Sequence, residues 1–197
     1  EHLSWYQLTL EPNTLFYHQP PALPDDELTC DIMEQGLSYL ENQGFKRYEV
    51  SAFNRQGQYP AQHNLNYWQF GDYLGIGAGA HGKITRMDDQ TITRTSKRRS
   101  PKDYLNSELS FIDSQNCIPK QELPLEFMMN VMRLSDGVEQ ERFFETTGLL
   151  LSEINSVLKE AEEAQLLLIE ENRIKPSETG FRFLNELLAL FMPENFP

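Results

Sequence analysis

Cysteine is scarce in this sequence, with Cys30 and Cys117 as its two members. Two cysteines this far apart form neither a disulfide framework nor a zinc motif, so we expect ordinary half-buried thiols in a reducing, cytoplasmic setting. The sequence also lacks an apolar run of the roughly 18 residues that a membrane span requires. It shows no basic and apolar leader either, so we expect neither a membrane span nor a secretory signal.

Positive charge is the second scarcity. The chain carries 17 Lys and Arg against 30 Asp and Glu, a net charge of -13, which opposes binding to nucleic-acid phosphates. The exception to the acidic balance is a basic island in residues 83–102, which contains Lys83, Arg86, Arg94, Lys97, Arg98, Arg99 and Lys102. A run of basic residues is usually a solvated surface, but the arginines of this island would also suit bidentate contacts with carboxylates.

The sequence does have enough apolar material to bury a core. It is 39% hydrophobic and 11% aromatic over 197 residues, a length that suits one large domain or two small ones. The chain opens on Glu1 and then on a strand-like run over residues 3–10, which has the pattern of a strand already in progress. We therefore expect the chain to be a fragment of a longer protein.

The first third of the chain has the pattern of an α/β protein. Residues 3–10 predict a strand. Asp25 and Asp26 predict the start of a helix, which Gly44 ends. Residues 47–53 predict a second strand, and a strand, a helix and a strand in this order predict a parallel crossover unit.

A glycine-rich loop occupies the middle of the chain. Residues 73–77 predict a short buried strand that opens into this loop, which spans residues 75–82. Residues 83–87 and 91–95 predict a β-hairpin. Ser100 then predicts the start of a helix, because a proline in the first helical position follows it.

From about residue 119 the pattern becomes helical. Residues 125–134 and 154–161 predict helices, residues 166–169 predict the first strand of a small hairpin, and residues 181–191 predict a last amphipathic helix. Helices, a hairpin and another helix are the order of a winged-helix-like module. The expected domains are residues 1–117 and residues 118–197.

Four motifs follow one another along the chain, and a helical tail over residues 125–192 comes after them. The motifs are Ser4-Trp5-Tyr6-Gln7-Leu8-Thr9-Leu10-Glu11-Pro12-Asn13-Thr14, Tyr48-Glu49-Val50-Ser51-Ala52-Phe53, His63-Asn64-Leu65-Asn66-Tyr67-Trp68 and Gly75-Ile76-Gly77-Ala78-Gly79-Ala80-His81-Gly82. In this order they resemble the carboxy-terminal half of the HemW-type and oxygen-independent coproporphyrinogen III oxidase-like radical-SAM family. The resemblance implies the carboxy-terminal strands of a partial (β/α) radical-SAM barrel, then a winged-helix-like helical domain, hence α/β followed by mostly α.

The resemblance also implies cofactors. In that family a Cys-x-x-x-Cys-x-x-Cys motif holds a [4Fe-4S] cluster, which binds and cleaves S-adenosylmethionine. This chain has no such motif, so we expect its ligands to lie in a missing amino-terminal half. We assign no catalytic residue and no metal ligand here, and we expect the fragment alone to be inactive.

The resemblance further implies where ligands lie. It places Gly75, Gly77, Gly79, Ala80 and His81 near S-adenosylmethionine; without it, the loop has the pattern of a close-packing turn. Haem or a porphyrinogen can be bound by imidazole, by aromatic rings and by arginine. The alternatives are a histidine satisfied by hydrogen bonds, core packing of the rings and a solvated basic surface. The candidates for haem or substrate are His63, Tyr67, Trp68, Arg98 and Arg99, with His81 as a second imidazole.

Two functions from different classes remain open at this point. The resemblance favours a haem chaperone, which binds haem and delivers it to an acceptor protein. The alternative is the oxidase, which decarboxylates propionate side chains in porphyrin biosynthesis through a radical on the cofactor. A third reading is an isolated domain without an activity of its own. A barrel without its early strands leaves an open edge, so we also expect the fragment to self-associate.

Overall fold

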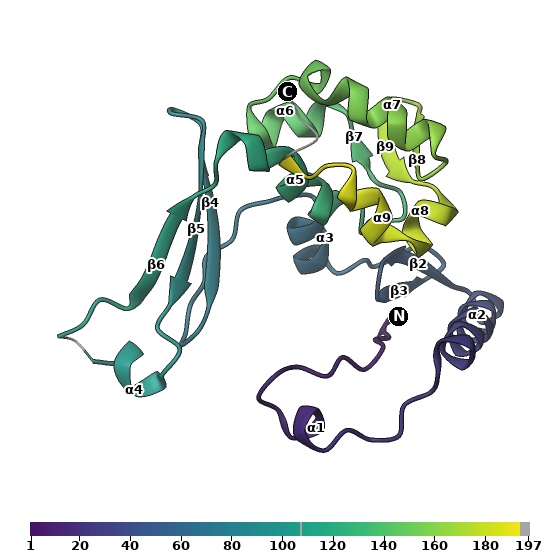
Figure 1. Cartoon of the computed structure of the whole chain (residues 1–197), viewed down its shortest axis with the longest axis horizontal. Helices are drawn as coiled ribbons and strands as arrows, with labels where there is room; N and C mark the ends of the chain where they lie inside the picture. The colour runs from purple at the N-terminus through teal and green to yellow at the C-terminus, as the bar shows by residue number, and fades with distance from the viewer. Residues whose placement is uncertain (107, 194–197) are drawn as a thin grey trace. The chain divides into compact units, whose positions relative to one another are not determined.

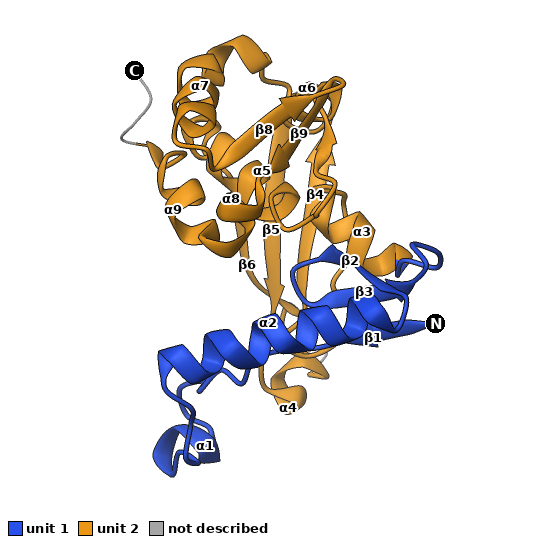
Figure 2. Ribbon diagram, turned by 90° about the vertical axis from the view of Figure 1, so that its right-hand side faces the viewer, with its two compact units in different colours: residues 1–61 blue, residues 62–197 orange. Residues whose placement is uncertain are grey.

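A computed structural model describes residues 1–106 and 108–193 of the chain. The chain divides into two compact units, Glu1–Ala61 and Gln62–Pro197, shown in different colours in Figure 2. Both units combine helices with small antiparallel sheets. Within the described residues, no helix is long and apolar enough to cross a membrane. The domain boundary predicted after residue 117 stays a prediction.

The sheet of the first unit corrects the predicted parallel crossover. Strands β1 (His2–Ser4) and β2 (Phe45–Glu49) both pair antiparallel with β3 (Ala52–Arg55), in the order β1-β3-β2. The strand predicted over residues 47–53 is therefore two strands, joined by a turn at residues 50–51. The two-residue turn lets β2 and β3 pair antiparallel directly. The other edge of β3 then pairs with β1.

The first strand is also shorter than predicted. Only His2–Ser4 of the expected run over residues 3–10 is a strand. Its partner β3 is four residues long, and pairing ends where Trp5 N–H donates to Ser51 O at 2.8 Å. Residues beyond that point have no strand to pair with and instead lead to a short helix, α1 (Leu15–His18), which Thr14 caps.

Helix α2 (Asp26–Asn42) agrees with the sequence-based prediction. The Asp25 carboxylate accepts a hydrogen bond from Leu28 N–H at 2.9 Å, and two acidic residues in the first turn favour the positive end of the helix dipole. Gly44 follows the helix with φ at +78°, a conformation that glycine adopts without strain. These end signals act within a few residues of the helix, which is why sequence alone locates it.

The second unit begins with helix α3 (Gln62–Trp68) and a three-stranded antiparallel sheet in the order β4-β5-β6, which extends away from the later helices of this unit (Figure 1). The predicted hairpin is confirmed as β4 and β5. Strand β6 was not predicted, because its polar sequence IDSQNC lacks the apolar alternation of a strand. The bounds are β4 (His81–Arg86), β5 (Thr91–Lys97), α4 (Pro101–Tyr104) and β6 (Ile112–Cys117).

The rest of the second unit is mainly helical. The helices predicted near residues 125–134 and 154–161 and the small hairpin are confirmed, with shifts of a few residues at their ends. The predicted last helix is two helices, because Phe183 between them has a non-helical backbone. The bounds are η1 (Lys120–Glu122), α5 (Leu123–Val131), β7 (Val138–Glu139), α6 (Glu141–Thr147), η2 (Leu151–Ile154), α7 (Asn155–Glu163), β8 (Leu167–Glu170), β9 (Arg173–Pro176), α8 (Glu178–Arg182) and α9 (Leu184–Ala189).

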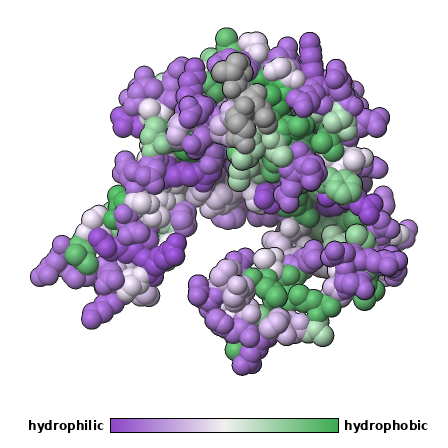
Figure 3. Space-filling view, in the orientation of Figure 1, coloured by the Kyte–Doolittle hydropathy of each residue, from purple (hydrophilic) through white to green (hydrophobic). Residues whose placement is uncertain are grey.

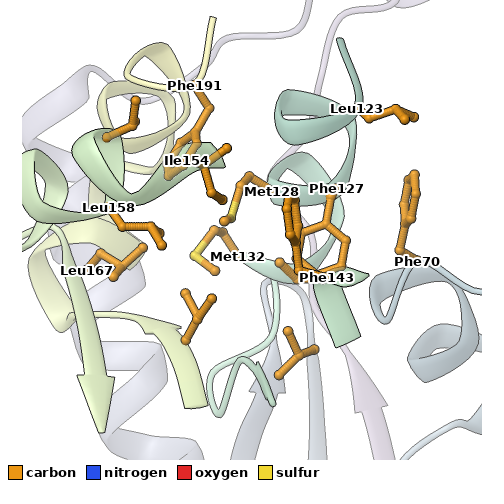
Figure 4. Packing of buried hydrophobic residues seen from close by; sticks show 14 of the residues in the cluster. Phe70, Leu123, Phe127, Met128, Met132, Phe143, Ile154, Leu158, Leu167 and Phe191 are labelled. Atoms are coloured by element: carbon orange, nitrogen blue, oxygen red, sulfur yellow. The ribbon is translucent and has the colours of Figure 1, made fainter. Parts of the chain in front are cut away.

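A hydrophobic cluster forms the core of the second unit, and Figure 4 shows its packing. Phe127 of α5 is fully buried and stands edge-on to Phe70 and to Phe143, with ring centroids 5.7 and 5.1 Å apart. Edge-to-face pairs at these distances add favourable quadrupole contacts to the burial itself. Phe70 lies between α3 and β4 in sequence, so it ties the region of the predicted ligand residues to the helical core.

Shortening Phe127 tests this core. Phe127→Ala is expected to lower the free energy of unfolding by about 3–5 kcal/mol, because it removes a fully buried ring and leaves a cavity beside two others. Urea denaturation followed by circular dichroism measures the loss. Phe144→Ala, an exposed phenylalanine of α6, is the matched control and should cost less than about 1 kcal/mol. Equal losses for the two variants would contradict this description of the core.

Candidate functional site

Helix α3 separates its side chains into two groups. His63 and Tyr67 stand one turn apart, with ring centroids at 4.7 Å and an interplanar angle of 70°. The ring of Tyr67 also lies against Tyr73, with centroids 4.3 Å apart. Leu65 and Trp68 instead pack against the hydrophobic cluster. The structure therefore brings His63 and Tyr67 together in a row of three rings, with the imidazole at its exposed end.

Trp68 belongs to the core rather than to this row of rings. Its side chain is half-buried, and the guanidinium of Arg133 lies 5.1 Å from its ring centroid. Its indole N–H is buried without a hydrogen-bond acceptor among the described residues. These contacts agree with the core-packing alternative for Trp68 and leave the exposed His63 and the half-buried Tyr67 as the rings of the motif that lie outside the core.

The glycine-rich loop is closed at its base by backbone hydrogen bonds. Tyr73 N–H donates to Lys83 O, and Lys83 N–H donates to Tyr73 O, both at 3.0 Å. This isolated bridge stands in place of the strand predicted over residues 73–77, because the chain forms no strand in the glycine-rich residues that follow. A Cβ atom at Gly75 would lie 2.2 Å from His81 O, so the two arms of the loop approach as closely as glycine allows.

Three N–H groups at the tip of the loop already donate hydrogen bonds to other protein atoms. Gly77 N–H donates to the Tyr104 hydroxyl at 3.1 Å, Gly79 N–H to Arg98 O at 2.9 Å, and Ala80 N–H to Gly77 O at 3.2 Å. Gly77 nevertheless has φ at +109° and no atom within 4 Å of where a Cβ would lie. A ligand at this loop would therefore lie over the open surface at Gly77, and these three N–H groups would not cradle it.

The basic residues next to the loop have defined contacts. Arg98 donates through Nε to Ser110 O at 2.6 Å, and the backbone of Arg99 lies 3.9 Å from a Cβ built at Gly79. Arg99 is exposed, as is His81 at the start of β4. Arg98 and Arg99 thus lie beside the loop. The arm that β4, β5 and β6 form is mainly hydrophilic on the face drawn in Figure 3, as a solvated surface would be.

One member of the basic island is not on the surface. Lys83 is only 2% exposed, and its ammonium group donates to Asp72 Oδ1 at 3.0 Å and lies 4.1 Å from the ring centroid of Phe70. Thr85 adds two donors to the same carboxylate, its N–H at 2.8 Å and its hydroxyl at 2.8 Å. Sequence analysis did not predict this pair, because nothing local shows that a lysine at the start of a polar hairpin is covered by the ring of Phe70.

Burial and hydrogen bonds act in opposite directions on this ion pair. Burial raises the pKa of the Asp72 carboxyl, but the donors from Thr85 and Lys83 outweigh it and leave the pKa below the ordinary value of 3.8. Burial lowers the pKa of Lys83, and the hydrogen bond to Asp72 only partly opposes this effect. The pair therefore depends on an ionised Asp72.

The described residues contain no group of three or more His, Cys, Asp or Glu side chains that could hold a metal ion. Cys30 and Cys117 are both free and exposed, which corrects the expectation of half-buried thiols. Three thiolates are needed to hold a cluster that leaves one iron open for a cofactor. The residues present here do not fit a [4Fe-4S] cluster, so none of the chemistry of such a cluster is assigned to them.

Comparison with known proteins identifies relatives over almost the whole chain. The heme chaperone HemW of Haemophilus influenzae is 45% identical over 193 residues, which cover 98% of this chain and 49% of that protein. The heme chaperone HemW of Escherichia coli is 46% identical over 193 residues, which cover 98% of this chain and 50% of that protein. Over almost its whole length the chain is similar to proteins of the HemW and HemN-like radical SAM family. It is a HemW homologue that spans about half the length of the curated relatives it matches.

Further matches agree with this family. The model of the HemN C-terminal domain matches residues 118–183. A mouse protein, mitochondrial radical S-adenosyl methionine domain-containing protein 1, is 35% identical over 98% of this chain and 47% of its own length. The solved structure of coproporphyrinogen III oxidase (HemN) from Escherichia coli, a radical SAM enzyme, has a TM-score of 0.69, covering 96% of this chain and 47% of that one. At 14% identity this likeness shows the shared fold alone.

The Asp72–Lys83 pair gives a stability prediction for this HemW homologue. Asp72→Asn is expected to lower the free energy of unfolding at pH 7 by about 2–3 kcal/mol, because it leaves the Lys83 ammonium buried without its counter-charge. The value is set below that of a fully buried pair because the Asp72 side chain is 40% exposed. Urea denaturation measures it, and Asp113→Asn on β6, an exposed acid, is the control.

The same pair should have a defined pH dependence. A carboxyl with a lowered native pKa contributes stability above its ordinary pKa, and this contribution disappears as pH falls through the native value. The difference between the wild type and Asp72→Asn should therefore be largest above pH 5, and it should shrink as pH falls through the native pKa, which lies below the ordinary value of 3.8. A difference that does not shrink at any acidic pH at which the wild type is still folded would show that the charge of Asp72 is not what stabilises the base of the loop.

Proposed function

We propose that this protein binds haem and delivers it to an acceptor protein, as the part of a radical-SAM protein of haem metabolism. The observation that carries the proposal is the 45–46% identity, over 98% of the chain, to two proteins named heme chaperone HemW. The residues that a haem would need are available at α3 and beside the glycine-rich loop. We also propose that the protein acts in the cytoplasm.

His63 is our proposed axial ligand of the haem iron. Its imidazole is exposed, stands beside the ring of Tyr67 and can approach a flat ligand edge-on. An imidazole of this kind binds haem iron through one ring nitrogen. Tyr67 supplies aromatic area against the porphyrin. Arg98 and Arg99 supply positive charge for the propionates, and arginine pairs with carboxylates in bidentate geometry.

The proposal includes S-adenosylmethionine and a [4Fe-4S] cluster in the complete protein. The residues of this chain proposed to lie near S-adenosylmethionine are Gly75, Gly77, Gly79, Ala80 and His81, and the open surface at Gly77 would admit it. Cluster and cofactor together would supply radical chemistry. The cluster ligands would come from outside this chain. The proposed domains remain residues 1–117 for the barrel portion and residues 118–197 for the winged-helix-like portion.

The alternative function is that of an oxygen-independent coproporphyrinogen III oxidase. The fold is compatible with it, because the TM-score with the enzyme of that name is 0.69, but this likeness carries no information on activity. What favours the chaperone is sequence, since 45% identity with HemW compares with 14% for the oxidase. Incubating the protein at its natural length, with its cluster reconstituted, with coproporphyrinogen III and S-adenosylmethionine separates the two. A decarboxylated product would overturn the chaperone proposal.

Haemin titration of the protein at its natural length tests the proposed ligand. His63→Ala is expected to weaken haemin binding at least tenfold and to shift the Soret band, because the iron loses its nitrogen ligand. His18→Ala, which removes an exposed histidine from the first unit, is the matched control and should leave both unchanged. A wild-type spectrum and affinity for His63→Ala would exclude His63 as the ligand.

Charge reversal next to the loop tests the proposed propionate contacts. Arg98→Glu with Arg99→Glu is expected to weaken haemin binding by about fivefold to tenfold at low salt, with a smaller effect at high salt, because exposed charges are screened. The control is Arg86→Glu with Lys159→Glu, which changes the net charge equally at exposed sites away from the loop. If both double variants lose the same affinity, only net charge matters and the arginines make no specific contact.

A further inference from the structure

We propose that Tyr73, Arg94 and Glu126 are positioning residues that fix the orientation of the His63 imidazole through the ring of Tyr67. The inference rests on the proposed haem-binding function, and it adds residues from the loop base, strand β5 and helix α5 to the site. None of the three would touch the haem iron. Their role would be to hold the ring row that ends at His63.

The need for such support follows from the helix that carries His63. Helix α3 has seven residues, about two turns, and helices this short are not stable by propensity alone. His63 is itself exposed, so the core does not hold its ring. The ring of His63 contacts that of Tyr67, with centroids 4.7 Å apart and an interplanar angle of 70°. The orientation of the imidazole therefore depends on where the Tyr67 ring is held.

Tyr73 is the second ring that contacts Tyr67. Its ring centroid is 4.3 Å from that of Tyr67, with an interplanar angle of 46°. Its backbone is fixed by the two 3.0 Å hydrogen bonds to Lys83 that close the glycine-rich loop. The backbone that carries the Tyr73 ring is therefore held by its own hydrogen bonds.

Arg94 fixes the other end of the Tyr73 ring. Arg94 lies opposite Lys83 in the β4–β5 register and donates through Nη1 to the Tyr73 hydroxyl at 3.5 Å. Its Nη2 atom is paired with the Glu126 carboxylate of α5. Charge-assisted contacts of this type are stronger and more directional than neutral ones. The Nε atom of Arg94 is buried without an acceptor in the described part of the chain, so Glu126 and Tyr73 together set the guanidinium position.

These contacts form a continuous line from the helical core to the exposed imidazole. Glu126 precedes Phe127, whose ring is at the centre of the core, so the line begins at a rigid part of the unit. Groups that orient a metal-binding histidine tune its affinity and ligand field even though they never contact the metal. The ring plane of His63 relative to a bound haem should therefore respond to changes at Tyr73, Arg94 or Glu126.

The test loads the protein at its natural length with haemin and records its electron paramagnetic resonance spectrum, which reports the plane of an axial imidazole. Tyr73→Leu is expected to broaden and shift the low-spin signals and to weaken binding about fivefold, the value of one lost aromatic pair. Tyr73→Phe keeps the ring but loses the hydroxyl that Arg94 contacts, so it should keep the affinity within about twofold of the wild type while shifting the signals as Glu126→Gln does. Glu126→Gln, which weakens the hold on Arg94 from a different element, should shift the signals in the same direction as Tyr73→Leu.

The control is Phe144→Leu, which removes an exposed ring from α6 and should leave the spectrum unchanged. Unchanged spectra and affinity for both Tyr73→Leu and Glu126→Gln, with His63→Ala still losing haemin, would overturn the positioning role and leave the haem-binding proposal intact. Failure of the wild type to bind haemin would overturn both, whereas wild-type binding by His63→Ala would overturn the positioning role together with His63 as the ligand. A melting curve for each variant separates loss of fold from loss of positioning, because only the latter changes the spectrum of folded protein.

Discussion

The ammonium group of Lys83 lies 3.0 Å from the Asp72 carboxylate and 4.1 Å from the centroid of Phe70, where water is largely excluded. This one interaction lies at the base of the glycine-rich loop, next to the backbone hydrogen bonds that close it. It also links the loop to the hydrophobic core, since Phe70 stands edge-on to Phe127. A buried charge is tolerated only when it is paired and hydrogen-bonded, and here Asp72 is in turn held by Thr85. The loop, strand β4 and the core are therefore fixed together.

The distribution of charge follows from the same constraint. The chain is strongly acidic overall, with one basic segment at the β4-β5-β6 sheet of the second unit. Inside that segment the cations have different environments. Lys83 is buried and Arg94 is paired with Glu126, whereas Arg99 remains exposed beside the loop. A basic run in the sequence thus resolves into structural cations and cations available to an anionic ligand.

Similarity to HemW and HemN-like proteins gives these features a common interpretation. The imidazole and tyrosine of α3, the glycine-rich loop and its neighbouring arginines all come from residues 62–99, between two parts of the chain that carry no ligand assignment. The described residues hold no metal-binding cluster, and the chain spans about half of its curated relatives. The haem-facing role that we propose for this segment therefore concerns binding and orientation, while redox chemistry would require groups from outside this chain.

Local signals in the sequence determined much of this structure. Asp25 and Gly44 mark the ends of α2, and the paired strand runs on either side of residues 88–90 define the β4–β5 hairpin. Each of these depends on contacts between residues that are near in sequence, so the chain carries the information within a few positions. Helix α3 was not predicted, because the segment that contains it has the polar composition of a connection. The motifs also pointed to the relatives that the comparisons identified.

Tertiary structure alone decided the rest. The antiparallel arrangement of the first sheet depends on β3 taking the place beside β1, and the polar strand β6 depends on β5 as a template. The burial of Lys83 depends on Phe70, and the support of Tyr73 depends on Arg94 and on Glu126, which is 32 positions further along the chain. These contacts join residues that no local pattern relates, because side-chain burial and strand pairing are settled only when distant segments meet.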